Sequence, residues 1–306
     1  MICFEVMAVE HTTVLSALSG GLYLSEVNLA GTHDSATAYC AFPKLAKCQD
    51  LTFREQLALG VRLLDIRLYR RGKHFYLVHG LSDCYTDDSK REKLQFDEVL
   101  AVCKAFLREN PRETLVLSIK QDRGHFETAF FEQFYHTYIE PDETIWYLEN
   151  RVPRLSECCG KLVLMRRCKR AANFRTAQNC GLDFSVWENQ NSKTETAPCE
   201  VALSSACIAT VQDRYRLPPE VKWAQSAKPF LDTCCPSPRQ ICVHFLSTCG
   251  GEGCPAENAP LVNAAFSAYP LCEAHAQGWF LLDFPTEDLC KKIMLSNAEI
   301  YKGDCV

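Results

Sequence analysis

The chain has 306 residues, 47% of them hydrophobic and 23% charged, so it can bury one large core, and a single domain is the simplest expectation. Its formal net charge of -5 excludes the strongly basic surface of a protein that binds nucleic acid non-specifically. Any binding of phosphate must therefore depend on a local cluster of cations.

The hydropathy of the chain argues against a membrane-spanning helix. No segment reaches the roughly 18 consecutive apolar residues that such a helix needs. Residues 1–10 lack the cationic start and apolar stretch of a signal peptide. We therefore expect a cytoplasmic protein or one that contacts a membrane from its periphery.

Nineteen cysteines, an odd number, are scattered along the chain, several of them inside expected strands and helices. Disulfide frameworks are typical of small secreted chains, so mostly reduced, buried thiols are expected here. The cysteine spacings also lack the paired Cys-x-x-Cys units of a zinc site. We therefore expect no structural zinc.

Short apolar runs, most of them separated by longer amphipathic segments, indicate an α/β fold. The expected strands lie at residues 27–30, 61–66, 75–78, 114–119, 162–165, 206–211, 241–246 and 279–282. The expected helices lie at residues 53–59, 96–109, 126–139, 220–234, 262–277 and 287–301. Eight strands predict a TIM-type (β/α)8 barrel. It must be irregular, because the helices are too few and the second and third strands are too close in sequence for a crossover helix.

Ionisable residues stand at the C-terminal ends of seven of these eight runs. They are His33 and Asp34, Asp65 and Arg67, His79, Lys120, Arg167, Asp213 and Asp283. In a barrel of parallel strands these ends meet on one face, where such barrels carry their active sites. At any one position a charge is explained equally well by the strand entering solvent. Seven ends together, two of them with a histidine, favour a common pocket.

Two histidines among carboxylates and cations suit phosphoryl transfer by acid and base catalysis. One imidazole can take a proton from an attacking hydroxyl while the other gives a proton to the leaving oxygen. A guanidinium beside them can bind phosphate oxygens and stabilise growing charge, and carboxylates behind them can orient the rings. This set of groups requires neither a metal nor another cofactor.

The segments around these positions resemble the X domain of bacterial-type phosphatidylinositol-specific phospholipase C. The matching segments are NLAGTHDSAT (28–37), QLALGVRLLDIR (56–67), LVHG (77–80), ETLVLSIK (113–120), GKLVLMRR (160–167), VQDRY (211–215) and GWFLLD (278–283). They occur in order over about residues 25 to 300. The resemblance implies an N-terminal extension at residues 1–24 and one catalytic barrel at residues 25–306.

The resemblance also implies roles for the two histidines. His33 would be the general base that takes the proton of the inositol 2-hydroxyl, oriented by Asp283. His79, with Asp34 as its partner, would be the general acid for the diacylglycerol leaving oxygen. The reaction would be an intramolecular attack that yields diacylglycerol and inositol 1,2-cyclic phosphate, so the enzyme would formally be a lyase.

The remaining matched residues would bind the substrate. Arg67 would hold the phosphate, supported by Asp65. The inositol ring would be contacted by Lys120, Arg167, Asp213 and, through stacking, Tyr215. Calcium-dependent members of the superfamily are expected to carry carboxylates at the positions of Arg67 and Lys120, and two fixed cations there would repel a hard cation. The resemblance therefore implies a metal-independent phosphodiesterase, with no cofactor.

Other readings stay open. One is a phosphodiesterase of the same fold that acts on a glycosylphosphatidylinositol or on a soluble inositol or glycerol phosphodiester. Another is a metal-dependent phosphodiesterase, which would need acidic residues at Arg67 and Lys120. The third is a non-catalytic inositol-lipid-binding domain, which would be expected to have lost one histidine. We expect a monomer whose partner is an inositol phospholipid and not a nucleic acid.

Two surface features bear on membrane contact. The stretches 39–48 and 250–260 lack the tryptophans that secreted bacterial relatives use at the bilayer, although Phe42, Leu45 and Leu261 offer some apolar surface. Trp187 belongs either to the rim of the pocket or to the core. A basic run, apart from the pocket candidate Arg167, is either a solvated face or a rim that attracts phosphoinositides. Its residues are Lys161, Arg166, Arg167, Lys169 and Arg170.

Overall fold

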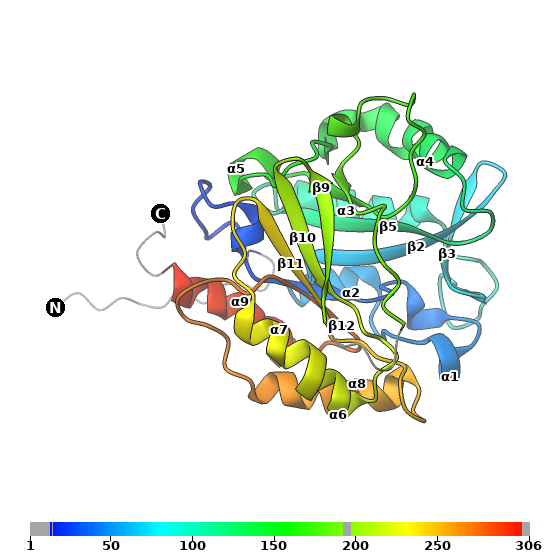
Figure 1. Cartoon of the computed structure of the whole chain (residues 1–306). Coiled ribbons are helices and arrows are strands. Elements are labelled where there is room, and N and C mark those ends of the chain that lie inside the picture. The colour runs from blue at the N-terminus through cyan, green and yellow to red at the C-terminus, as the bar shows by residue number, and fades with distance from the viewer. Residues whose placement is uncertain (1–12, 14, 192–196, 302–306) are drawn as a thin grey trace.

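A curved sheet of mostly parallel strands lies at the centre of the fold, with helices packed around it (Figure 1). The computed structural model describes residues 13, 15–191 and 197–301. Neighbouring strands follow the order β6-β7-β5-β2-β1-β12-β11-β10-β9, and β8 pairs with β7. The barrel wall consists of β1 (Leu29–Thr32), β2 (Leu63–Arg71), β5 (Leu115–Arg123), β7 (Leu162–Arg166), β8 (Leu182–Asp183), β10 (Cys207–Gln212), β11 (Gln240–Phe245) and β12 (Trp279–Leu282).

This architecture is the irregular TIM-type barrel that the sequence predicts. Its strands are parallel from β8 through β1 to β10, and among the described strands no ladder joins β8 to β9 or β10. The wall is therefore open on that side. The antiparallel strand β9 (Cys199–Ser204) pairs with β10 at this edge.

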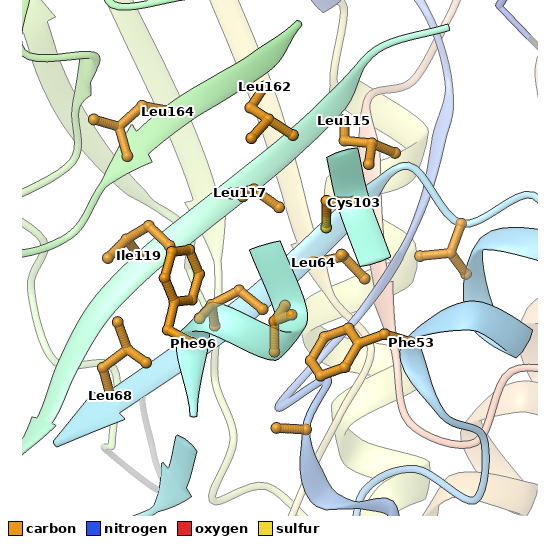
Figure 2. Close-up of a cluster of buried hydrophobic side chains, with 14 of the residues drawn as sticks. Phe53, Leu64, Leu68, Phe96, Cys103, Leu115, Leu117, Ile119, Leu162 and Leu164 are labelled. Carbon is orange, nitrogen blue, oxygen red and sulfur yellow. The ribbon is translucent and has the colours of Figure 1, made fainter. Parts of the chain in front are cut away.

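Side chains alternate between the two faces of the sheet, as extended strands require. On the outer face, Leu64, Leu117 and Leu164 pack in the core cluster that includes Phe53 and Phe96 of the covering helices (Figure 2). This alternation buries both faces of the parallel strands, which explains why their sequences read as continuous apolar runs.

In each of these strands, the residue before the outward-facing leucine points to the inner face of the sheet. Leu63, Val116 and Val163 pack with Trp279 in a second core cluster inside the barrel. Leu15, which precedes the first strand, also packs in this cluster. The structure therefore uses residues before the first strand to cover the interior of the barrel.

Three predicted helices are confirmed with nearly the predicted bounds: α2 (Phe53–Ala58), α3 (Phe96–Glu109) and α9 (Glu287–Ile300). Thr52 caps α2 and Thr286 caps α9, each accepting a hydrogen bond from a main-chain N–H of the first turn. The helix expected at 220–234 is a continuous run of α6 (Pro219–Lys222), η6 (Trp223–Ala227) and α7 (Lys228–Thr233). The helix expected at 126–139 begins later, as α4 (Ala129–Phe134) followed by η3 (Tyr135–Ile139).

Two predicted elements are wrong in detail. The helix expected at 262–277 is α8 (Pro255–Ala268), because Pro255 suits the first helical turn and Pro270 prevents continuation. The run at 75–78 belongs to β3 (His74–His79), which pairs antiparallel with β2 in a hairpin and is not a barrel strand. The missing parallel strand is β8, whose two residues are too short to produce a recognisable pattern.

Short segments complete the fold. They are β4 (Ser82–Asp83), β6 (Trp146–Tyr147), α1 (Pro43–Ala46), α5 (Leu155–Cys158), η1 (Leu24–Glu26), η2 (Thr37–Tyr39), η4 (Glu140–Ile145) and η5 (Ala177–Asn179). Within the described ranges, no helix is both long enough and apolar enough to cross a bilayer. The cysteines of these ranges are free thiols, and most of them are buried, as expected.

Candidate active site

The C-terminal ends of the barrel strands surround a pocket of about 520 Å³. The predicted site residues that line it are His33, Arg67, His79, Lys120, Arg167, Asp213, Tyr215 and Asp283. The other two, Asp34 and Asp65, are almost completely buried and contact lining residues. The structure thus brings all of the predicted site residues together, while their catalytic roles remain predictions.

His33 follows β1 and is held by its neighbour strand. Its main-chain N–H donates to Leu282 O of β12 at 3.0 Å, and its Nδ1 lies 2.8 Å from Asp283 Oδ1. The amide of Gln49 donates to His33 O and to Leu282 O. Because β1 and β12 are paired in the sheet, the orientation of the imidazole is fixed by the barrel itself.

Burial, assisted by the charge of Arg67, lowers the pKa of His33 well below its usual value. Burial also raises the pKa of Asp283, and the Asp34 carboxylate adds to this effect. At neutral pH the His33 imidazole is therefore uncharged. When its Nδ1–H donates to Asp283, its Nε2 is free to accept a proton, which is the state that a general base requires.

Asp34 contacts three groups with a single oxygen. Its Oδ2 lies 3.2 Å from His33 Nε2, 3.3 Å from His79 Nε2 and 2.9 Å from Arg67 Nη1. Of these three contacts, only the one with His79 is predicted from the sequence. Asp34 has a φ of 44°, in the left-handed region, which is uncommon for residues other than glycine although Asp adopts it more readily than most. This backbone geometry directs the carboxylate between the two histidines.

His79 ends β3 and faces His33 across the pocket. The two ring centroids are 6.1 Å apart and the rings are nearly perpendicular. His79 Nδ1 donates to Ala46 O at 2.8 Å, so its Nε2 points toward Asp34 and the pocket. The next residue, Gly80, donates its N–H to Asp122 Oδ2 at 2.7 Å. Both sides of His79 are therefore anchored.

Arg67 is held by two carboxylates and cannot rotate freely. Its Nε donates to Asp65 Oδ2 at 3.0 Å, while its Nη1 pairs with Asp34. Asp65 also accepts from Arg167 Nη1 at 2.9 Å and from Ser118 Oγ at 3.3 Å. Burial alone would raise the pKa of Asp65, but the two arginines outweigh it and lower this pKa. The carboxylate therefore stays ionised and supports both guanidinium groups.

Asp122 also lines the pocket, although its place there is not predicted from the sequence. Its Oδ1 accepts from Lys120 Nζ at 2.5 Å, and its Oδ2 holds the backbone of Gly80. Lys120 and Asp122 lie two positions apart on β5, so their side chains point to the same face of the strand. The apolar run ends at Ile119, whereas β5 continues to Arg123, and only this longer strand would have indicated Asp122.

Residues 184–190, which follow β8, form one wall of the pocket. Of these residues, only Trp187 is a candidate from the sequence. Its ring centroid lies 3.9 Å from Arg167 Cζ, in a cation–π contact. The Trp187 ring also packs against Phe245 at 5.5 Å. Asn189 of the same segment accepts a hydrogen bond from the Tyr215 hydroxyl at 2.9 Å. Trp187 is thus a wall residue that fixes a pocket cation.

The basic run is not one surface. Arg166 is buried and pairs with Asp183 at 2.5 Å, and Arg170 donates to main-chain carbonyls of the loop that follows it. Arg167 alone of these three lines the pocket. The two alternatives of a solvated face and a lipid-attracting rim are therefore wrong for the buried Arg166, while the half-buried Arg170 stabilises the loop that follows it.

Fold and pocket together define a TIM-type α/β barrel protein with a paired-histidine site. Residues 33–168 match the family model for the phosphatidylinositol-specific phospholipase C, X domain. This part of the chain is similar to the X-domain family, as the motifs predict.

Curated relatives agree with this placement. A 1-phosphatidylinositol phosphodiesterase of Staphylococcus aureus (strain Newman) is 31% identical over 165 residues, which cover 50% of each chain. One of Listeria monocytogenes serovar 1/2a is 23% identical over 165 residues, 49% of this chain and 47% of the relative. The chain thus spans about half the length of the curated relatives it matches.

Solved structures extend the similarity of the fold along the chain. A phosphatidylinositol-specific phospholipase C from Staphylococcus aureus superposes with a TM-score of 0.76, at 23% identity, over 94% of this chain and 97% of that one. The Listeria monocytogenes enzyme gives 0.71 at 20% identity, over 94% and 99%. These structures support the barrel fold.

Proposed function

We propose that this protein is a metal-independent phospholipase C that cleaves phosphatidylinositol to diacylglycerol and inositol 1,2-cyclic phosphate. The observation that carries the proposal is the pair of imidazoles that face each other across Asp34 and Arg67. In the forward step, His33 Nε2 takes the proton of the inositol 2-hydroxyl as its oxygen bonds to phosphorus. The bond from phosphorus to the diacylglycerol oxygen breaks, and His79 Nε2 gives that oxygen a proton.

The cations of the pocket suit the charge that this step develops. Arg67 lines the pocket beside both histidines, and its guanidinium can stabilise negative charge on the phosphate oxygens of a bound substrate. Lys120, Arg167 and Asp213 offer donors and an acceptor for ring hydroxyls, and Tyr215 offers an aromatic face. The enzyme would thus bind a phosphorylated polyol by its hydroxyls.

Metal independence is supported by the partners of the acidic residues. Asp34 and Asp65 are the carboxylates that a hard cation near the phosphate would need, and both are already paired with guanidinium groups. A divalent ion there would lie beside Arg67 and would have to compete with it. The guanidinium of Arg67, held by Asp34 and Asp65, supplies the positive charge that a metal would otherwise supply.

We also propose that the rim of the pocket contacts the lipid surface. Leu45 of α1 lines the pocket and is 78% exposed, and Phe42 beside it is 54% exposed. Leu261 of α8, a helix in contact with α1, is 52% exposed. These apolar side chains next to the pocket mouth suit a shallow, peripheral contact with a bilayer interface.

The function is tested with phosphatidylinositol in mixed detergent micelles. We expect phosphorus NMR to show inositol 1,2-cyclic phosphate as the first product, at an unchanged rate after dialysis against EDTA. Loss of turnover with the chelator would contradict metal independence. A glycosylphosphatidylinositol and a soluble glycerophosphoinositol are assayed in parallel, and turnover of these alone would assign the protein to the alternative substrate class.

The pH dependence of turnover provides a second test. Burial raises the pKa of Asp34 to about 6, with Arg67 and His79 opposing the rise. The carboxylate that contacts both histidines is therefore ionised above about pH 6 and protonated below it. We expect kcat/KM to fall as the pH drops through about 6. Asp34→Asn should have low activity without this limb, and an acid limb near pH 4 in the unmodified protein would contradict the assignment.

A further inference from the structure

A buried lysine lies directly behind the pocket wall. Lys222, the last residue of α6, has no exposed surface, and its Nζ donates to Gln212 Oε1 at 2.6 Å. Lysine is rarely buried without a charged or strongly polar partner, because removing an ammonium from water is unfavourable. Its position next to the active site therefore requires an explanation.

Gln212 connects this lysine to the end of a barrel strand. It is the last residue of β10 and immediately precedes Asp213, which lines the pocket. Its Oε1 also accepts from Arg214 N and Ser226 Oγ, both at 3.2 Å. Its Nε2 donates to Phe245 O, at the end of β11, at 3.0 Å. Lys222 thus belongs to the network that fixes the strand ends beneath Asp213.

The acids around the pocket outnumber the cations that line it. Three buried acids, Asp34, Asp65 and Asp283, and two half-buried ones, Asp122 and Asp213, stand at or beneath it, and Glu188, which also lines it, is exposed. Three cations line it: Arg67, Lys120 and Arg167. A phosphodiester would add a further negative charge. Lys222, a fully buried cation on the Asp213 side of the pocket, reduces this excess.

Electrostatic coupling joins the lysine to two of these acids. Burial raises the pKa of Asp213, and Lys222 is the strongest of the groups that oppose this rise, followed by Arg167 and Arg67 and then Lys120. Burial likewise lowers the pKa of Lys222 to about 7, opposed by Asp213 and Asp283, while Arg214 lowers it further and Cys249 raises it. The lysine and the Asp213 carboxylate thus favour each other's charged state.

We propose that Lys222 is a positioning residue for the headgroup, whose buried ammonium keeps Asp213 ionised and aligned to accept hydrogen bonds from the ring hydroxyls. The inference rests on the proposed function, because a polyol headgroup is the ligand of Asp213. A purely structural role explains the charge less well, since Gln212 Oε1 already accepts from Arg214 N and Ser226 Oγ and does not need an ammonium as its donor.

Three variants separate the charge from the hydrogen bond. Lys222→Gln keeps a donor for Gln212 but removes the charge, Lys222→Met removes both, and Lys222→Arg keeps the charge. We expect Lys222→Gln and Lys222→Met to raise KM for phosphatidylinositol, and the inhibition constant of free myo-inositol, on the order of tenfold, with a smaller change in kcat. Lys222→Arg should recover part of this loss. Lys228→Gln is the matched control, because Lys228 is exposed and pairs with Asp232 on α7.

The pH profile distinguishes this electrostatic role from packing. Without the Lys222 charge, Asp213 protonates at a higher pH. The KM ratio of Lys222→Gln to the unmodified protein should therefore increase as the pH falls below 7. It should shrink above pH 7, where Lys222 itself loses its proton. A role in packing alone would give a ratio that does not change with pH.

A double-mutant cycle completes the test. If Lys222 acts through Asp213, then Asp213→Asn combined with Lys222→Gln should bind myo-inositol no more weakly than Asp213→Asn alone. Additive losses would overturn the proposal, as would a pH-independent ratio or unchanged KM in Lys222→Gln. If Lys222→Met fails to fold, Lys222→Gln and the double-mutant cycle still test the proposal. Absence of turnover in the unmodified protein would instead overturn the proposed function, and this inference with it.

Discussion

Replacing His33 by alanine is expected to lower kcat for phosphatidylinositol by roughly 10³- to 10⁴-fold, and His79→Ala by a similar factor. His33 Nε2 is the proton acceptor of the pocket, because Nδ1 is committed to Asp283. His79 is the second imidazole at the same space. The measurement is the initial rate of cyclic phosphate formation. His136→Ala, at an exposed helical position paired with Glu140, should retain full activity.

The leaving group separates the two roles. A substrate whose leaving group is a nitrophenol needs little protonation of its leaving oxygen, so a general acid contributes less to its cleavage. His79→Ala should therefore recover much of its rate on such a substrate, while His33→Ala should not. The opposite pattern would exchange the assigned acid and base. Activity near that of the unmodified protein in either variant would remove that histidine from the reaction.

The sequence predicts this site well because barrel topology does most of the positioning. Residues at the C-terminal ends of parallel strands must meet on one face, so His33, Arg67 and Asp283 can be assigned to one pocket from strand ends alone. The pairing of β1 with β12 then brings His33 to Asp283, although they are 250 residues apart. Such contacts follow from the strand order, which the alternating pattern of strands and helices indicates.

Other parts of the site depend on local geometry that has no periodic signal. The contact of Asp34 with both histidines needs a left-handed backbone at that residue, which nothing in the pattern of apolar residues predicts. The wall around Trp187 comes from a loop, and the pocket position of Asp122 depends on three further residues of β5. Lys222 was assigned only to a helix, because its burial depends on how α6 packs behind β10.

Arg67→Gln is expected to lower kcat/KM by about 10³-fold. This is the size of effect expected when a donor that stabilises charge in the transition state is removed. Arg67→Lys should recover less than about tenfold of this loss, because one ammonium cannot reproduce the two directions of the guanidinium. Arg67 Nε reaches Asp65 and Nη1 reaches Asp34, at 3.0 and 2.9 Å. The measurement is steady-state turnover of phosphatidylinositol, and Arg70→Gln on the exposed end of β2 is the control.

The pH profile of Arg67→Gln shows whether the loss comes from the phosphate contact alone. Arg67 is the strongest group opposing the raised pKa of Asp34, so its removal should move the acid limb of kcat/KM above pH 6. Part of the loss should then be recovered at higher pH, where Asp34 is ionised again. The remaining loss measures the contact with phosphate. An acid limb that stays in place would mean that Arg67 acts on the substrate without holding the charge of Asp34.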